Sequence, residues 1–196
     1  MTKMQNETLN CSPNIWQPML QQQVFRGLLD AFSYPGRITA CADSETTACL
    51  AILVALVDGE TTLADPQQWL SSALWSKLEA RHSIPEKAAF ILLDGFQATD
   101  FKPSIGTLDA PETGATILLR VNSLHPDLSG NLRLQLRGPG IESTTSISVD
   151  GLHPAWITAR QEWVSAFPLG VDLLLCDAHH FVAIPRTTQV EVGGLA

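Results

Sequence analysis

The chain has 196 residues, of which 45% are hydrophobic, and it carries a formal net charge of −8. A chain of this length can bury roughly 70% of the surface that its unfolded form exposes, so we expect one compact domain. The acidic balance is the reverse of the basic surface that holds nucleic acid by its phosphates, so nucleic acid is not an expected partner. The longest apolar run, 48–57, falls short of the ~20 residues of a membrane-spanning helix, and the polar start has no apolar signal core. The sequence therefore predicts a soluble, cytoplasmic protein with no membrane partner.

The first half of the chain alternates helices with short strands. Apolar residues recur four apart from Leu20 to Phe32, which predicts an amphipathic helix. Pro35 and Gly36 end this helix because neither continues it comfortably, and a short strand is expected from Arg37.

Two more helices are expected before residue 82. The segment 43–59 begins with capping residues and is apolar on nearly every side, which predicts a helix buried within the fold. A brief strand at 61–64 leads to Asp65 and Pro66, where an aspartate cap precedes proline at the first helical position. The helix that they open is expected to run to about Arg81.

The sequence of the second half predicts mainly β-strands. Four short runs separated by turn residues suit strands, namely 88–94, 115–121, 132–138 and 145–149. His153 and Pro154 then open another helix. The last two runs, 171–176 and 181–185, flank a tight turn and predict a hairpin.

This order of elements predicts a three-layer α/β/α sandwich with a mixed sheet. Alternation of strands and helices gives parallel strand pairs, and hairpins give antiparallel pairs. No linker is long enough to divide the chain. We therefore expect a flexible N-terminal tail at 1–15 and a single α/β domain at 16–196.

Common cofactor and nucleophile motifs are missing from the sequence. It has no dinucleotide-binding glycine motif, Walker loop, paired-histidine zinc motif or serine nucleophile elbow. The four cysteines and five histidines lack the spacing of metal ligands, so we expect reduced thiols and no metal. The acidic cluster Asp58, Glu60 and Asp65 leaves a magnesium site open as an alternative, although Asp58 lies at a helix end and Asp65 at a helix start.

Lysine usage argues against covalent pyridoxal phosphate chemistry. The lysines are Lys3, Lys77, Lys87 and Lys102. A Schiff-base lysine must be desolvated in a pocket, whereas Lys77 falls on an amphipathic helix and Lys3 in the tail. We therefore expect no cofactor.

The end of the chain holds the main binding candidates. Pro185 suits a strand end, so the backbone is expected to leave the sheet there and to present Arg186 beside Thr187 and Thr188. A guanidinium donates two parallel hydrogen bonds to phosphate, phosphonate or carboxylate, and the hydroxyls add further donors. These chemical properties leave two interpretations open: an oxyanion-binding site, or a structural ion pair between Arg186 and a buried carboxylate such as Asp172.

Asp58 and Gly36 are candidates for supporting roles in such an oxyanion site. Gly36 lies in a proline-glycine turn whose backbone amides can cradle phosphate, although the proline removes one donor. Asp58 is the acidic residue that an enzyme acting on phosphate or phosphonate would use beside Arg186. No catalytic residue can be named from the sequence.

The segments "FPLGVDLLL" and "FVAIPRTTQVEV" closely resemble the carboxyl-terminal signature of the H subunit of the bacterial carbon-phosphorus lyase system. Upstream blocks follow the order of that family, namely "FRGLLDAFSYPGRI", "ALVDGETTL", "ETGATILL" and "LRLQLRGPGI". The resemblance runs from about Phe25 to Val192, nearly the whole chain.

The resemblance implies a part in alkylphosphonate breakdown. In that system the G, H, I and J subunits form a core complex, and the I subunit joins an alkylphosphonate to the ribose of ATP with loss of adenine. The product from methylphosphonate is α-D-ribose 1-methylphosphonate 5-triphosphate. The resemblance further implies a homodimer in isolation, and a fold similar to pyridoxal-phosphate-dependent transferases without their cofactor.

Two classes of function follow. The first is a non-autonomous subunit that positions other subunits or completes a site at an interface, with no activity alone. The second is an independent small-molecule enzyme that handles phosphate or phosphonate with Arg186, Thr187, Thr188 and Asp58. The first is favoured because no nucleophile-base pair or metal cluster can be assembled from the spacing of residues.

Overall fold

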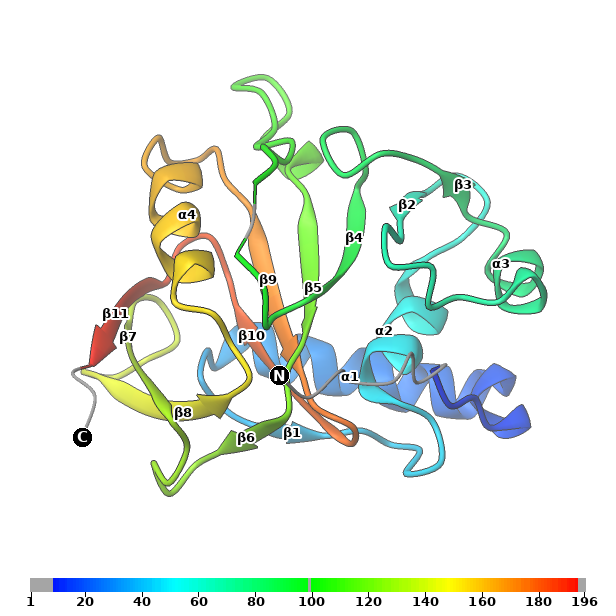
Figure 1. Ribbon diagram of the computed structural model, residues 1–196, viewed down its shortest axis with the longest axis horizontal. Coiled ribbons are helices and arrows are strands. Elements are labelled where there is room, and N and C mark those ends of the chain that lie inside the picture. Colours follow the sequence, from blue (N-terminus) through cyan, green and yellow to red (C-terminus); the bar gives the residue numbers. More distant parts are fainter. Residues whose placement is uncertain (1–8, 99, 194–196) are drawn as a thin grey trace.

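The computed structural model describes residues 9–98 and 100–193, and its centre is a seven-stranded mixed sheet (Figure 1). The strand order is β1-β10-β9-β5-β4-β2-β3. Parallel pairs join β9, β5, β4, β2 and β3, whereas β10 runs antiparallel to both β9 and β1. The bounds are Thr39–Ala40 (β1), Thr62–Ala64 (β2), Arg81–His82 (β3), Phe90–Asp94 (β4), Thr116–Arg120 (β5), Asp172–Cys176 (β9) and His180–Ile184 (β10). The predicted mixed sheet and the hairpin of its last two strands are confirmed.

Helices cover one face of this sheet. They are η1 (Pro13–Trp16), α1 (Pro18–Ser33), α2 (Ala48–Leu56) and α3 (Ser72–Leu78). Leu118 and Leu174 face this layer, whereas their strand neighbours Ile117 and Leu173 face the opposite core. The central strands are therefore buried on both sides, which explains their nearly continuous apolar runs.

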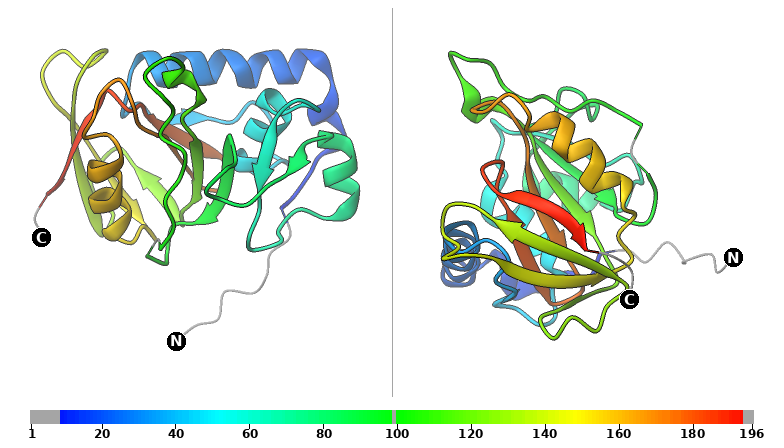
Figure 2. Two further views of the ribbon diagram at one scale, coloured as in Figure 1. Left: turned by 90° about the horizontal axis from the view of Figure 1, so that it is seen from above. Right: turned by 90° about the vertical axis from the view of Figure 1, so that its left-hand side faces the viewer.

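The opposite face is covered mainly by a second sheet. This four-stranded antiparallel sheet has the order β11-β7-β8-β6 and is accompanied by α4 (Ala155–Trp163). In the left view of Figure 2, α1 and α4 lie on opposite sides of the molecule. The strands are β6 (Ser123–His125), β7 (Leu132–Arg137), β8 (Thr145–Asp150) and β11 (Gln189–Gly193).

The prediction of helices in both outer layers was therefore wrong for this layer. In β7, buried and exposed side chains alternate, as in an antiparallel strand with one solvated face. Such alternation shows which side chains face the core, but it does not show which of two sheets a strand joins. The third layer is consequently a sheet with one helix.

Helices α2 and α3 are shorter than predicted. The aspartates that were expected to cap them instead accept hydrogen bonds within turns that precede each helix. Asp65 accepts hydrogen bonds from the backbone amides of Trp69 and Leu70, and the helix begins only after Ser71, whose hydroxyl accepts from Leu74 N. Asp43 likewise accepts from Glu45 N and from the hydroxyl of Thr46, and α2 begins at Ala48.

The packed part of the chain begins earlier than predicted. Of the expected tail, residues 1–8 lie outside the described residues. Leu9 and Ile15 are buried in the core beneath α1 and α2, and Ser12 N donates to Thr46 Oγ1 at 3.0 Å. Residues 9–15 thus belong to the folded unit.

The chain crosses from the central sheet to the second sheet at Pro185. Strand β10 ends at Ile184, the amide of Thr188 donates to the carbonyl of Pro185 at 2.9 Å, and β11 then pairs with β7. The predicted departure of the backbone at Pro185 is confirmed. Among the helices of the described chain, none combines the length and the apolar character needed to span a bilayer.

Candidate functional site

The turn between the two sheets places Arg186 against Asp172, the first residue of β9. Antiparallel pairing of Ile184 with Leu173 brings the two side chains together. The backbone amide of Arg186 donates to Asp172 Oδ1 at 2.7 Å, and Nη2 donates to Oδ2 at 2.7 Å. Nε adds longer bonds of 3.3 and 3.4 Å to the same carboxylate. The oxyanion that the Arg186 fork holds in this structure is therefore the carboxylate of its own chain, which is the structural pair that the sequence left open.

Arg186 also ties down the loop before β5. Its Nη1 donates to the carbonyl of Pro111, which lies in the short helix η2 (Pro111–Thr113). The Arg186 and Asp172 side chains are only 15% and 17% exposed. A Cβ atom at Gly114 would collide with the carbonyl oxygen of Gly170 and would lie 2.9 Å from Arg186 Nη1, so a glycine is needed there. Arg186 thus braces three chain segments at one end of the interior strands β9 and β5.

The two threonines after Arg186 have opposite surroundings. Thr187 is exposed, whereas Thr188 is 1% exposed. The buried hydroxyl oxygen of Thr188 has no hydrogen-bond partner in the described chain. A buried hydroxyl without a partner is uncommon, because its desolvation is not offset.

Arg160 on α4 is a charged residue that the sequence reasoning missed. Its side chain is 1% exposed, and its Nη2 donates to the carbonyl of Pro185. Burial lowers its pKa to about 10, while the nearby Asp172 acts in the opposite direction. The position was detectable, because Arg160 follows Trp156 by four residues and Ile157 by three and so lies on the apolar face of the helix.

An aromatic cluster fixes α4 in this position. The ring centroids of Trp156 and Trp163 are 6.4 Å apart, and Phe101 packs against both. Trp156 and Ile157 are buried in the core between the two sheets. The helix is therefore held firmly enough to keep Arg160 directed at the turn.

A hollow of about 590 Å³ opens between α4 and the turn. We call it the α4 hollow. The right view of Figure 2 shows α4 and β11 side by side at this end of the molecule. The lining residues come from α4, the segment that follows it, the turn and β11, and they include Arg160, Phe167, Arg186, Thr187, Thr188 and Glu191.

Comparison with known proteins identifies the family. A model described as "Bacterial phosphonate metabolism protein (PhnH)" matches residues 14–191. The chain belongs to the PhnH family. It is 42% identical over 180 residues to "Putative C-P lyase subunit protein HtxG" of Stutzerimonas stutzeri, covering 92% of this chain and 90% of that protein. It is 30% identical over 193 residues to "Alpha-D-ribose 1-methylphosphonate 5-triphosphate synthase subunit PhnH" of Rhizobium meliloti (strain 1021), covering 87% and 90%. The resemblance indicated by the sequence blocks is confirmed.

The remaining supporting candidates of this PhnH-family chain lie elsewhere. Asp58 is exposed in the turn after α2, where hydrogen bonds from the Thr61 hydroxyl and the Glu60 amide lower its pKa. Gly36 has φ +88°, and a Cβ there would lie 2.5 Å from Thr145 and 2.7 Å from Leu136. Gly36 thus lets the end of α1 approach the second sheet. Neither residue lines the α4 hollow.

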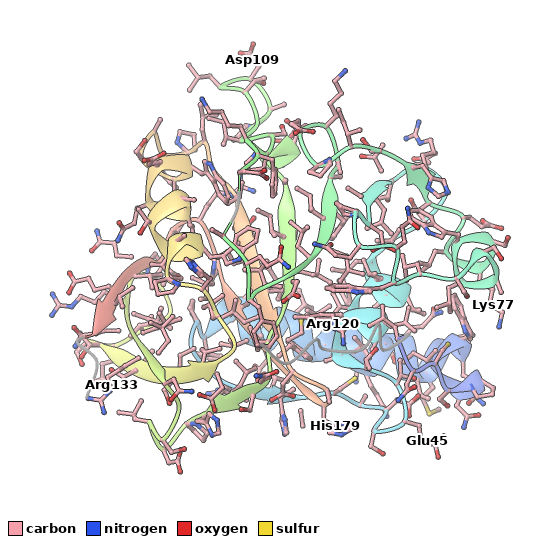
Figure 3. All side chains as sticks on the ribbon, in the orientation of Figure 1. Glu45, Lys77, Asp109, Arg120, Arg133 and His179 are labelled. Atoms are coloured by element: carbon pink, nitrogen blue, oxygen red, sulfur yellow. The ribbon has the colours of Figure 1, made fainter. Side chains whose placement is uncertain are left out.

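The acidic cluster and the lysines named from the sequence are not gathered into one site in the described part of this PhnH-family chain. Among residues 9–98 and 100–193, no three histidine, cysteine, aspartate or glutamate side chains lie close enough to hold a metal ion. The predicted alternative of a magnesium site at Asp58, Glu60 and Asp65 is therefore not formed in this structure. Lys77, Lys87 and Lys102 are exposed, and Figure 3 shows Lys77 at the edge of the molecule. A Schiff-base lysine must be desolvated in a pocket, and none of these three side chains is buried. Lys3 lies outside the described residues.

A second polar cluster, formed at β6 and β8, was not foreseen. Ser129 Oγ lies 3.2 Å from His125 Nδ1, and His125 Nε2 lies 3.0 Å from Asp150 Oδ2. The order serine, histidine, aspartate is that of a nucleophile with its base. However, the Ser129 hydroxyl donates to Asp127 at 2.8 Å, so it is directed at a carboxylate and not at a base. The cluster is a half-buried hydrogen-bonded group at the ends of β6 and β8, and it does not line the α4 hollow.

Proposed function

We propose that this protein is a subunit of the carbon-phosphorus lyase core complex in alkylphosphonate catabolism. There it serves the formation of α-D-ribose 1-methylphosphonate 5-triphosphate from ATP and methylphosphonate. The observation that carries the proposal is the family match over residues 14–191, together with relatives that are named as subunits and align over about nine tenths of both chains.

The role within the complex is non-autonomous: the chain positions other subunits or completes a site at an interface. The geometry around Arg186 supports this role, because the guanidinium is engaged by Asp172 and Pro111 and does not present a free fork. An independent enzyme would need a directed nucleophile or base beside its binding groups. The Ser129 hydroxyl does not meet that requirement, since it donates to Asp127.

The partners in this proposal are the G, I and J subunits, and the isolated chain forms a homodimer in the cytoplasm. The fold is similar to that of pyridoxal-phosphate-dependent transferases without their cofactor. Parallel central strands with helices on one face, and exposed lysines, are compatible with such a relationship. Sedimentation of the isolated chain at micromolar concentration tests the dimer, and a monomer there contradicts it.

Reconstitution tests the subunit role. The chain is purified alone and with the G, I and J subunits, and adenine release from ATP is measured with and without methylphosphonate. We expect methylphosphonate-dependent release from the mixture and none from the chain alone, because the chain supplies only part of the site. Omission of this chain from the mixture is the control. Full activity without it, or activity of the chain alone, contradicts the proposal.

A further inference from the structure

Arg160 is a buried cation without a carboxylate of its own. Its Nε has no hydrogen-bond partner in the described chain, and its Nη2 meets only the neutral carbonyl of Pro185. The acidic group that acts on it is Asp172, which already binds the amide, Nε and Nη2 of Arg186. Among the described residues, Asp172 forms its ion pair with Arg186 and no carboxylate lies within ion-pair distance of Arg160, so the Arg160 guanidinium has no direct counter-ion.

Such an arrangement is unfavourable unless an anion completes it. Arginine keeps its proton at neutral pH, so it cannot escape the cost of burial by becoming neutral. Buried charges in proteins are paired or bind ions, because desolvation of an isolated charge is expensive. Burial of the Arg160 guanidinium costs free energy, and the aromatic cluster nevertheless fixes α4 in a position that keeps this charge buried. We therefore expect an anionic ligand that offsets this cost when it binds.

The α4 hollow borders this cation and offers a second unsatisfied group. Arg160 and Thr188 both line it, and the Thr188 hydroxyl is buried without a partner. The charged lining residues are Arg160, Arg186 and Glu191, of which Glu191 is exposed to water that screens its charge. The lining therefore carries a net positive charge, and the cation is its most buried member.

The size and the remaining lining of the hollow restrict the ligand. A volume of about 590 Å³ is in the range of small-molecule sites and exceeds the needs of a bare inorganic ion. Val164 and Phe167 add apolar surface to the lining. The combination suits a small molecule with an anionic head and an apolar or extended remainder.

We propose that the α4 hollow binds the phosphonyl or phosphoryl group of a small molecule, with Arg160 as its counter-ion and the Thr188 hydroxyl as a hydrogen-bond donor. The choice of this oxyanion over others rests on the proposed function, since that function involves methylphosphonate and ATP. Arg186 is a positioning residue here, because it holds the turn against Asp172 and leaves Arg160 as the available charge. An anion near a poorly solvated guanidinium is attracted more strongly than in water.

Binding to the isolated full-length chain tests the proposal. Calorimetry and thermal unfolding are measured with methylphosphonate and with inorganic phosphate, against sodium chloride at matched ionic strength. We expect the unfolding temperature to rise with either oxyanion and not with chloride, since a ligand that binds only the folded state stabilises it. No binding of either oxyanion by the parent chain overturns the proposal without any variant.

Two variants and a matched control locate the binding groups. Arg160→Gln removes the buried charge and should weaken oxyanion binding at least tenfold, while Thr188→Val keeps the shape, removes the hydroxyl and should weaken binding severalfold. Arg37→Gln removes an exposed arginine that pairs with Asp30, and it should leave binding unchanged. If Arg160→Gln does not fold, Thr188→Val decides; unchanged affinity in a folded variant of either residue overturns the proposal.

The complex separates this inference from the proposed function. If the parent chain binds methylphosphonate but does not support adenine release with the G, I and J subunits, the site stands and the subunit role fails. If the chain assembles and supports release but binds neither oxyanion, the subunit role stands and the site fails. A folded Arg160→Gln variant that binds the oxyanions normally but fails to assemble assigns the counter-ion to a partner carboxylate and also overturns the site.

Discussion

At the scale of single residues, the turn after β10 shows how one arginine organises its surroundings. Sequence reasoning predicted that Pro185 would release the chain from the sheet, which is observed, and that Arg186 would follow directly at this bend. It left open whether the guanidinium binds a ligand or a carboxylate, because the fourteen-residue separation of Asp172 and Arg186 becomes a contact only through strand pairing. Arg160 was missed because a charged residue inside an apolar helical pattern is ordinarily assigned to the solvated face.

The fork of Arg186 predicts the effect of a conservative substitution. Arg186→Lys keeps the charge but replaces several directed N–H groups by one ammonium, so the bonds to Asp172 and Pro111 cannot all be kept. We expect the free energy of unfolding to fall by about 1–3 kcal/mol, measured by urea denaturation. Arg37→Lys is the control: it alters an exposed pair with Asp30 and should change stability by less than about 1 kcal/mol. Equal stability of Arg186→Lys and the parent chain would show that the hydrogen bonds from Arg186 to Asp172 and Pro111 do not stabilise the fold.

The close approach of two loops at Gly114 gives a second prediction. Gly114 has φ −63°, so alanine fits its backbone, but the added Cβ would collide with the carbonyl oxygen of Gly170 and crowd Arg186. Gly114→Ala should therefore cost about 1–3 kcal/mol of unfolding free energy. At Gly59 the nearest atoms to an added Cβ are 3.9 Å away, so Gly59→Ala should be neutral or slightly stabilising. The same loss of stability in both variants would mean that the collision is not the cause.

At the scale of elements, the sequence predicted the central strands and the last hairpin well, because continuous apolar runs and turn residues are strong local signals. It did not predict how β7, β8 and β11 assemble. Their alternating pattern identifies a buried face, but the choice between joining the central sheet and building a second one depends on which surfaces remain uncovered. The short α3 was overpredicted because Asp65 caps a turn in the same way as it would cap a helix.

The second sheet carries a carboxylate with a pH-dependent role. Hydrogen bonding from the Asn131 amide at 2.7 Å is the main cause that lowers the pKa of Asp150, with His125 and Ser123 contributing. A folded-state pKa below the ordinary 3.8 means that the stabilisation is present above that value and is lost as pH falls through the lower folded value. Asp150→Asn should therefore reduce stability by about 1 kcal/mol near neutral pH, and the difference from the parent should shrink below about pH 4.

Denaturation curves from pH 7 to pH 3 provide this measurement. Asp109, an exposed residue at the tip of a loop far from β8 in Figure 3, supplies the control variant Asp109→Asn. A difference between Asp150→Asn and the parent that stays constant over the whole pH range would contradict the electrostatic explanation.

At the scale of the whole molecule, the two sheets and the helices form one folded unit that includes the segment 9–15. Polar composition predicted a flexible tail there, but Leu9 and Ile15 are spaced to reach the core beneath α1 and α2. A short apolar pair in a polar stretch has no periodicity, so only tertiary packing reveals it.

This packing predicts a large effect from a residue near the start of the chain. Ile15 is fully buried, so Ile15→Ala should leave a cavity and cost about 2–5 kcal/mol of unfolding free energy. Met19 on the outer side of α1 is 70% exposed, and Met19→Ala should change stability by less than about 0.5 kcal/mol. Thermal or urea unfolding measures both, and a parent-like Ile15→Ala would assign residues 9–15 to a dispensable tail after all.

The pairing of β1 with β10, and of β11 with β7, has a consequence for biosynthesis. Both pairs join strands far apart in the chain, and such non-local contacts slow folding because a long loop must be closed before they form. The turn at Pro185 and β11 are also translated after every other described element. A growing polypeptide therefore contains the α4 segment before it contains the turn that completes the α4 hollow. Only chains that have been translated through β11 can present that surface, so a shorter nascent chain cannot bind any ligand that requires it.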